Sequence, residues 1–207
     1  MLDIWLDLLY YRGMKPYYQD HYVTIYHGDC REILPELPMV DLVLTDPPYP
    51  DQHLEYGKCD ISFLKDMECR QLVFWSAKVE FPLDYTAVHI WDKRVGVGSM
   101  YERIFERNGQ HQYKVFSAMP ITCEYKAIRS ADVWTGHKSQ KPRHLIQKLV
   151  VLASMPGNIL VDMFMGTGVV VEVAKKLNRK CIGIEIEEKY CEIAANRCRQ
   201  MVMELEI

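Results

Sequence analysis

The chain has 207 residues, 49% of them hydrophobic and 26% charged, which is the make-up of an ordinary globular protein with a sizeable core. No apolar run approaches the roughly 20 residues of a membrane helix, and the first residues lack the basic region of a signal peptide, so we expect neither a membrane span nor secretion. Seven cysteines without a Cys-x-x-Cys pair argue against a disulfide framework and a structural zinc site. We expect free thiols, a cytoplasmic location and no bound metal.

The net charge of −3 is unevenly divided along the chain. Residues 1–90 hold 7 basic and 15 acidic residues, a balance of −8, whereas residues 91–145 hold 10 basic and 5 acidic residues, a balance of +5. Residues 146–207 hold eight of each sign. A basic middle segment suits a local phosphate-binding face, although a solvated charged loop would give the same count. The candidates for phosphate contacts are Lys93, Arg94, Arg103, Arg107, Lys114, Lys126 and Arg129.

The first half of the chain predicts strands separated by turns and short helices. Alternating β-forming residues at 22–27 end at Gly28-Asp29, and a second strand at 40–45 ends at two prolines. Short helices are predicted at 31–37, before Pro38, and at 61–68. Further strands are predicted at 71–75, 87–91 and 101–106, and residues 108–136 show no period.

The last third alternates regularly between helices and strands. Pro142 opens a helix to residue 152, and the Pro156-Gly157 pair ends it. Predicted elements then follow as a strand at 158–162, a helix at 168–177, a strand at 180–185 and a helix at 188–201. This alternation predicts an α/β fold with a doubly wound, mainly parallel sheet, whose ligands bind outside the carboxyl ends of the strands.

A glycine turn follows the strand that ends at Asp162, in the sequence Asp162-Met-Phe-Met-Gly166-Thr167-Gly168. Glycines there let the backbone approach a ligand closely. Glu185 ends the next strand, and an acid about 20 residues after such a turn suits ribose hydroxyls. The pair indicates a cofactor that contains adenosine, while a tight turn with a helix-capping acid is the alternative.

The sequence Thr45-Asp46-Pro47-Pro48-Tyr49 lies at another strand end. The prolines fix the backbone, so the Pro47 carbonyl cannot easily turn away. Asp46 adds carboxylate acceptors and Tyr49 adds a flat aromatic surface. Together they form a slot for a planar ring that bears an –NH₂ group, although a Pro-Pro turn can also simply end a strand.

These two motifs together resemble the DNA amino-methyltransferases of the permuted beta class, in which the catalytic motif precedes the cofactor-binding half. The resemblance covers residues 22–197 and extends to Gly28-Asp29-Cys30, Trp91-Asp92-Lys93, Tyr101-Glu102 and His137 to Pro142. The last segment has Lys138 and Ser139 where the family has Pro and Thr. The resemblance implies a circularly permuted, Rossmann-like class I methyltransferase fold in a single domain. Its parts would be an N-terminal extension (1–20), a catalytic half (21–107), a short target-recognition insert (108–136) and a cofactor-binding half (137–207).

The resemblance also assigns roles to individual residues. Asp46, Pro47, Pro48 and Tyr49 would be catalytic, holding a base that is flipped out of the DNA helix. S-adenosyl-L-methionine would be the cofactor, with Asp29 and the Cys30 amide at its adenine and Glu185 at its ribose hydroxyls. Asp29 can equally be a turn-forming residue. Lys141 would lie near the cofactor's carboxylate. The remaining cofactor-binding residues would be Ser139, Gln140, Asp162, Phe164, Gly166, Thr167 and Gly168.

Adenine N6 in DNA is the expected methyl acceptor, because family members that modify adenine usually carry Asp at the first motif position and cytosine-N4 enzymes usually carry Ser. Cytosine N4 is the alternative, followed by an RNA or protein amide and by a non-catalytic DNA-binding module. The sequence leaves open whether the protein forms a homodimer, whether a restriction endonuclease accompanies it or it is solitary or phage-borne, and which site it recognises.

Overall fold

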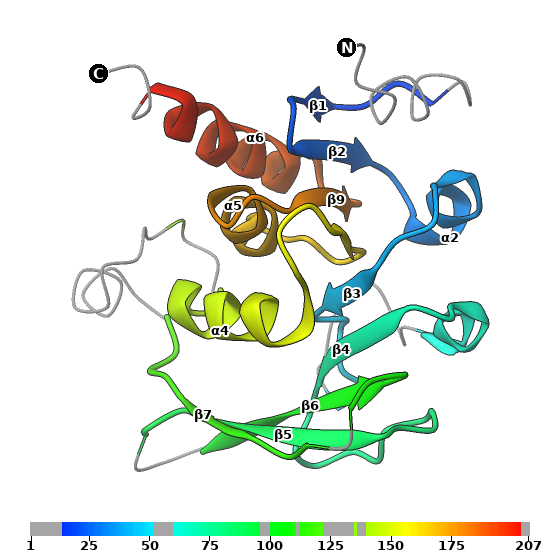
Figure 1. Ribbon diagram of the computed structural model, residues 1–207, viewed down its shortest axis with the longest axis vertical. Coiled ribbons are helices and arrows are strands. Elements are labelled where there is room, and N and C mark those ends of the chain that lie inside the picture. The colour runs from blue at the N-terminus through cyan, green and yellow to red at the C-terminus, as the bar shows by residue number, and fades with distance from the viewer. Residues whose placement is uncertain are drawn as a thin grey trace.

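The computed structural model describes residues 14–51, 60–95, 100–110, 112–121, 135 and 140–203. Within them nine strands form one sheet in the order β1-β2-β9-β8-β3-β4-β6-β5-β7 (Figure 1). The strands are β1 (Tyr18–Gln19), β2 (Val23–His27), β3 (Leu42–Thr45), β4 (Arg70–Trp75), β5 (Ala87–Asp92), β6 (Tyr101–Arg107), β7 (Val115–Ser117), β8 (Ile159–Asp162) and β9 (Lys180–Glu185). The five strands from β2 to β4 are parallel, and β6 is antiparallel to both of its neighbours. The predicted mainly parallel sheet is therefore confirmed.

Helices cover both faces of this sheet. The helices are α2 (Cys30–Ile33), α4 (Arg143–Ala153), α5 (Val169–Lys176) and α6 (Glu188–Met203), with 3₁₀ turns η1 (Leu34–Glu36) and η2 (Ser62–Asp66). Helix α5 contacts both α4 and α6, and Figure 1 shows these three on one side of the strands with α2 on the other. The doubly wound arrangement is therefore confirmed as well. No helix in the described ranges is long and apolar enough to cross a membrane.

Two predicted helices are shorter and tighter than expected. The helix predicted at 31–37 is α-helical only to Ile33 and continues as η1, because Pro35 has no N–H with which to extend the α-helical bonds. The helix predicted at 61–68 is the 3₁₀ turn η2. In the segment predicted to be irregular, β7 pairs in parallel with β5, while residues 122–134 lie outside the described ranges.

The core lies in the parallel strands, whose side chains are buried on both faces as this sheet type requires. Leu42, Val43 and Leu44 are fully buried in β3. The apolar run of each central strand ends in a buried polar residue, and these are Thr45 in β3, Asp162 in β8 and Glu185 in β9. Because β3, β8 and β9 are adjacent and parallel, the three polar groups gather at one edge of the sheet.

The turn between β8 and α5 contains two glycines, and each position favours glycine for a different physical reason. Gly166 has a φ of +52°, and a Cβ there would meet nothing within 4 Å. Gly168 has a φ of +79°, and its Cβ would lie 2.5 Å from Ala194 Cβ and 3.0 Å from Ala194 Cα in α6. The missing side chain of Gly168 therefore allows α6 to pack against the start of α5, a role that the sequence did not suggest.

We expect Gly168→Ala to lower the free energy of unfolding by about 3 kcal/mol, because it combines left-handed backbone strain with a clash against α6. Gly166→Ala is the matched control, since it adds only the backbone strain of about 1 kcal/mol. Urea unfolding of both variants measures the difference. Equal losses would mean that α6 moves aside without cost.

Candidate active site

A hydrogen bond joins the two strand ends that carry the predicted motifs. Thr45 Oγ1 donates to Asp162 Oδ1 at 2.9 Å, across 117 residues of sequence. The Asp46 motif begins at the residue after Thr45, and the glycine turn begins just after Asp162. The structure therefore brings the two predicted half-sites together at one edge of the sheet.

Asp46 lies in a cluster of four other polar side chains. The Tyr49 hydroxyl donates to Asp46 Oδ1 at 2.6 Å, and the Lys141 ammonium pairs with Asp46 Oδ2. Glu102, from β6, places Oε2 at 3.1 Å from the Tyr49 hydroxyl and at 3.6 Å from Lys141 Nζ. Lys93 Nζ binds Glu102 Oε1 at 2.6 Å. The cluster thus contains two carboxylates and two ammonium groups.

Aromatic rings surround this cluster. Lys141 Nζ lies 5.0 Å from the ring centroid of Phe74, 5.8 Å from that of Trp91 and 6.0 Å from that of Tyr49. The Tyr49 ring also packs at 5.9 Å against Trp75 and is only 6% exposed. The ring face that was expected to stack on a base is therefore covered in this conformation.

Burial and the neighbouring charges shift the pKa values of the cluster in opposite directions. Burial is the largest influence on Asp46 and raises the pKa of its carboxyl, although Lys141 opposes the shift. For Lys141 burial lowers the pKa, but Asp46 and Glu102 together outweigh it and raise the pKa overall. For Glu102 burial raises the pKa, and Lys141 with Lys93 brings it below the usual value. The ion pairs of the cluster are therefore mutually dependent.

A second group of acids lies beside the glycine turn. Glu185 accepts hydrogen bonds from the Gly166 amide at 2.7 Å and from the Glu187 amide at 2.9 Å, and burial raises the pKa of its carboxyl. Asp162 also accepts from the Phe164 amide at 3.3 Å, and burial raises the pKa of Asp162 to about 7. These acids face the turn, with open space at Gly166. Thr167, within the turn, is also buried.

The segment Gly28-Asp29-Cys30 lies against the end of β9. The Gly28 amide donates to the Glu185 carbonyl at 2.9 Å. Asp29 caps α2 by accepting from the Arg31 amide at 2.9 Å and also binds the Arg31 guanidinium. This hydrogen bond to its own helix is the turn-forming role that the sequence left open.

The loop before α4 supplies both a structural and a site residue. Gln140 is buried and accepts from Thr135 Oγ1 at 2.7 Å and from Arg197 Nη2 at 3.2 Å, so it ties the loop to α6. Lys141 points into the Asp46 cluster and pairs with its two carboxylates. Ser139 lies outside the described ranges.

Three of the seven candidates for phosphate contacts are bound to groups within the protein instead. Arg103 donates to the carbonyls of Ser76 and Val79. Arg107 is buried and donates to three acceptors, which are the Asp84 carbonyl, the Leu64 carbonyl and Gln71 Oε1. Lys93 pairs with Glu102 in the site. Arg94 and Lys114 are exposed, whereas Lys126 and Arg129 lie outside the described ranges.

The sequence did not identify Glu102 or Thr45 as site residues. Glu102 lies between the exposed Tyr101 and the charged Arg103 at the start of its strand, so it has the appearance of a surface acid. The available signal was its place in a strand whose residues are buried from Ile104 onward. Thr45 is a β-forming residue in a strand, and only the sheet order reveals its contact with Asp162.

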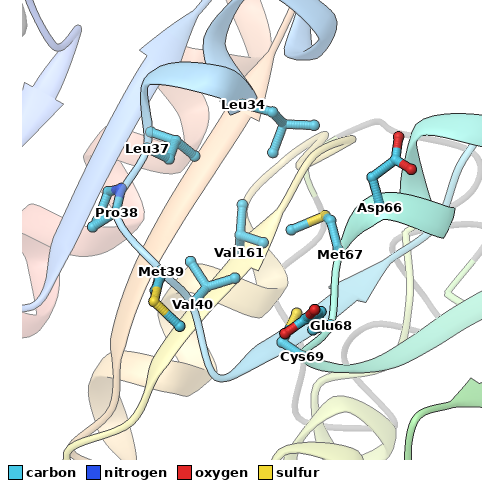
Figure 2. Close-up of a pocket in the computed structure, with 10 residues that line it drawn as sticks. All are labelled: Leu34, Leu37, Pro38, Met39, Val40, Asp66, Met67, Glu68, Cys69 and Val161. Atoms are coloured by element: carbon cyan, nitrogen blue, oxygen red, sulfur yellow. The ribbon is translucent and has the colours of Figure 1, made fainter.

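A separate hollow lies toward the amino ends of β3 and β4, away from Asp46. It has a volume of about 270 Å³, and Figure 2 shows mostly apolar side chains around it. These come from η1 and the chain after it, from the end of η2 and the segment between η2 and β4, and from Val161 of β8. Among the described residues, no group of His, Cys, Asp and Glu could hold a metal ion there or elsewhere.

Comparisons with known proteins bear on this site. A profile of the family described as DNA methylase matches residues 85–196, more than half of the chain. Type II methyltransferase M.HinfI of Haemophilus influenzae is 32% identical over 101 residues, which are 49% of this chain and 28% of that relative. The match thus covers less than a third of that relative's length.

Solved structures show the same fold. The PvuII DNA methyltransferase, described as cytosine-N4-specific, superposes with a TM-score of 0.69 at 17% identity over 89% of both chains. The M1.HpyAVI–SAM complex superposes with a TM-score of 0.57 at 22% identity over 84% of this chain and 99% of that one. The Rossmann-like class I methyltransferase fold expected from the sequence is therefore confirmed.

Proposed function

Because this chain belongs to the DNA methylase family, we propose that it transfers a methyl group from S-adenosyl-L-methionine to N6 of adenine in DNA. The observation that carries the proposal is the hydrogen bond between Thr45 and Asp162. It holds a slot for a base amine and a turn for an adenosine cofactor at adjacent strand ends. Reaction in line needs this proximity, which is worth several kcal/mol on general grounds.

The base amine binds at the Asp46 motif. Asp46 and the Pro47 carbonyl accept its two hydrogens, which turns the nitrogen lone pair toward the methyl group, and Pro48 fixes the turn. As positive charge develops on the nitrogen, the nearby carboxylate stabilises it. Tyr49 lies along the slot, and its ring must leave Trp75 if it is to stack on the base. No covalent bond to the protein is required.

The glycine turn fits S-adenosyl-L-methionine, which supplies an electrophilic methyl group when bound. The Glu185 carboxylate keeps lone pairs for the ribose hydroxyls, since each of its oxygens accepts one amide and can accept a second donor. Buried Asp162 suits an ammonium group such as that of the methionine part. Phe164 and Gly166, which has open space beside it, would contact the same cofactor, with Asp29 and the Cys30 amide at its adenine end. The solved M1.HpyAVI–SAM complex of the same fold supports S-adenosyl-L-methionine as the cofactor.

The DNA is held by exposed cations outside the cluster. Among the residues that the structure describes, Arg94 and Lys114 are the candidates for this role. Phosphate contacts of this kind bind all sequences alike.

The proposal is tested by incubating the protein with DNA and labelled cofactor, followed by digestion to nucleosides and mass spectrometry. N6-methyldeoxyadenosine is the expected product. N4-methyldeoxycytidine would favour the second candidate, which the likeness to the cytosine-N4-specific PvuII enzyme supports. Cofactor binding without either product would indicate a non-catalytic DNA-binding protein. Methylome sequencing of an expressing host then identifies the recognition site.

We expect Glu185→Ala to weaken binding of S-adenosyl-L-methionine by about 2–3 kcal/mol, because a buried carboxylate loses hydrogen bonds to two hydroxyls. Isothermal titration calorimetry measures the change. Glu188→Ala, at an exposed position of α6, is the control and should bind as the wild type does. Unchanged affinity in the Glu185 variant would place the ribose elsewhere.

A further inference from the structure

Both carboxylate oxygens of Asp46 are already engaged. The Tyr49 hydroxyl binds Oδ1 at 2.6 Å, and the Lys141 ammonium binds Oδ2. In the proposed function Asp46 must accept a base amine and face the positive charge that develops on it. An ammonium group held on the same carboxylate cancels much of that field in a buried site. Asp46 therefore needs to release at least Lys141 before it can act.

Glu102 is positioned to accept the hydrogen-bond donors that Asp46 releases. Its Oε2 lies 3.1 Å from the Tyr49 hydroxyl and 3.6 Å from Lys141 Nζ. Its other oxygen is held by Lys93 at 2.6 Å, and its side chain is only 13% exposed. Among the described residues, Glu102 is the only carboxylate besides Asp46 that contacts both Tyr49 and Lys141.

The two donors can each change acceptor with a small movement. The Tyr49 hydroxyl has one hydrogen and can donate it to only one of the two carboxylates at a time. Lys141 has three hydrogens and already lies within ion-pair distance of both carboxylates. A rotation of the hydroxyl and a shift of Nζ by less than about 1 Å would bring both donors to ordinary hydrogen-bond distance from Glu102.

We propose, on the basis of the function inferred above, that Glu102 is a positioning residue that takes Lys141 and the Tyr49 hydroxyl from Asp46 when the base amine enters. The exchange transfers no proton and leaves the total charge of the cluster unchanged, because two carboxylates and two ammonium groups remain. Its effect is to move a positive charge away from the reacting nitrogen. Lys93 keeps Glu102 fixed and ionised throughout.

The exchange has a specific pH signature. The titratable groups that face Lys141 are Asp46 and Tyr49 from the loop after β3 and Glu102 from β6, with Lys93 behind Glu102; the rings of Phe74 and Trp91 complete its surroundings. Without the Glu102 charge, Lys141 stays on Asp46 at neutral pH. It also loses one of the two charges that raise its pKa, so the pKa of Lys141 is lower than in the wild type, and a rise in pH neutralises Lys141 and frees Asp46 sooner than it would there.

The test is the single-turnover methylation rate of Glu102→Gln from pH 7 to about 9.5, with Glu80→Gln as a control for the same chemical change at an exposed position. At pH 7 we expect Glu102→Gln to be slower by about 10- to 100-fold, with cofactor affinity within twofold of the wild type. The deficit relative to the wild type should shrink as the pH rises. Glu80→Gln should stay within twofold throughout.

A second measurement separates positioning from loss of folding. If Glu102 acts mainly through Lys141, adding Glu102→Gln to a Lys141→Met variant should slow it far less than Glu102→Gln slows the wild type, because coupled residues are not additive; the remaining loss reflects the Tyr49 hydroxyl. A full additional loss, or a deficit that is equal at every pH, would overturn the proposal, as would a Glu102→Gln rate within twofold of the wild type. The outcome is distinct from failure of the proposed function, in which the wild type itself would methylate no DNA.

Discussion

Asp46→Ala is expected to lower the rate of methyl transfer by at least about 10³-fold, while binding of S-adenosyl-L-methionine stays within a few-fold. The variant loses the acceptor for the amine and the charge that stabilises the developing positive nitrogen, and a single preorganised group of this kind is worth about 10²–10³ in rate. The loss should be greater here, because Lys141 remains in the site without its main counterion and repels that nitrogen. Single-turnover assays and calorimetry on the same preparation measure both effects.

Asp46→Asn is the useful companion to this variant, since it keeps the shape of the side chain and one acceptor oxygen. We expect it to retain more activity than Asp46→Ala but far less than the wild type. An alanine variant that kept most of the wild-type rate would remove Asp46 from the reaction. Loss of cofactor binding together with activity would mean that Asp46 supports the whole edge of the sheet.

Asp162→Asn is expected to stabilise the protein at pH 8 and to abolish tight cofactor binding. The pKa of Asp162 is raised to about 7 by burial, whereas an unfolded aspartate has a pKa of about 3.9. Between these values the folded state keeps a proton that the unfolded state has lost. Stability from this group therefore falls as the pH rises from about 4 through 7 and stays low above 7.

The asparagine side chain does not ionise, so the variant does not lose stability from this position as the pH rises. Its oxygen can still accept from Thr45 and from the Phe164 amide, as Asp162 Oδ1 does. We expect a gain of about 2 kcal/mol at pH 8 and little change near pH 4. Urea unfolding at the two pH values measures it, with exposed Asp66→Asn as the control. If the variant were less stable than the wild type at pH 8, the raised pKa of Asp162 would not be the cause of a stability loss at this pH.

The strands and their terminal motifs could be predicted because they depend on local sequence. Apolar runs, two prolines after Asp46 and the glycines after Asp162 each mark a boundary within a few residues. The contacts of Glu102 could not be predicted, because they depend on the register in which β6 pairs with β5, Trp91 opposite Glu102. The same reason explains the error over Arg107. A count of charges does not distinguish an exposed cation from one that is buried on backbone carbonyls.

The order of strands in the sheet also affects how the protein can be made. Strands β8 and β9, residues 159–185, lie between β2 and β3, which come near the start of the chain. During synthesis β2 and β3 therefore emerge long before the strands that separate them, and each has an unpaired edge until then. Such edges invite wrong pairing, and contacts between distant segments slow folding. We expect the nascent chain to depend on chaperones until residue 185 has left the ribosome.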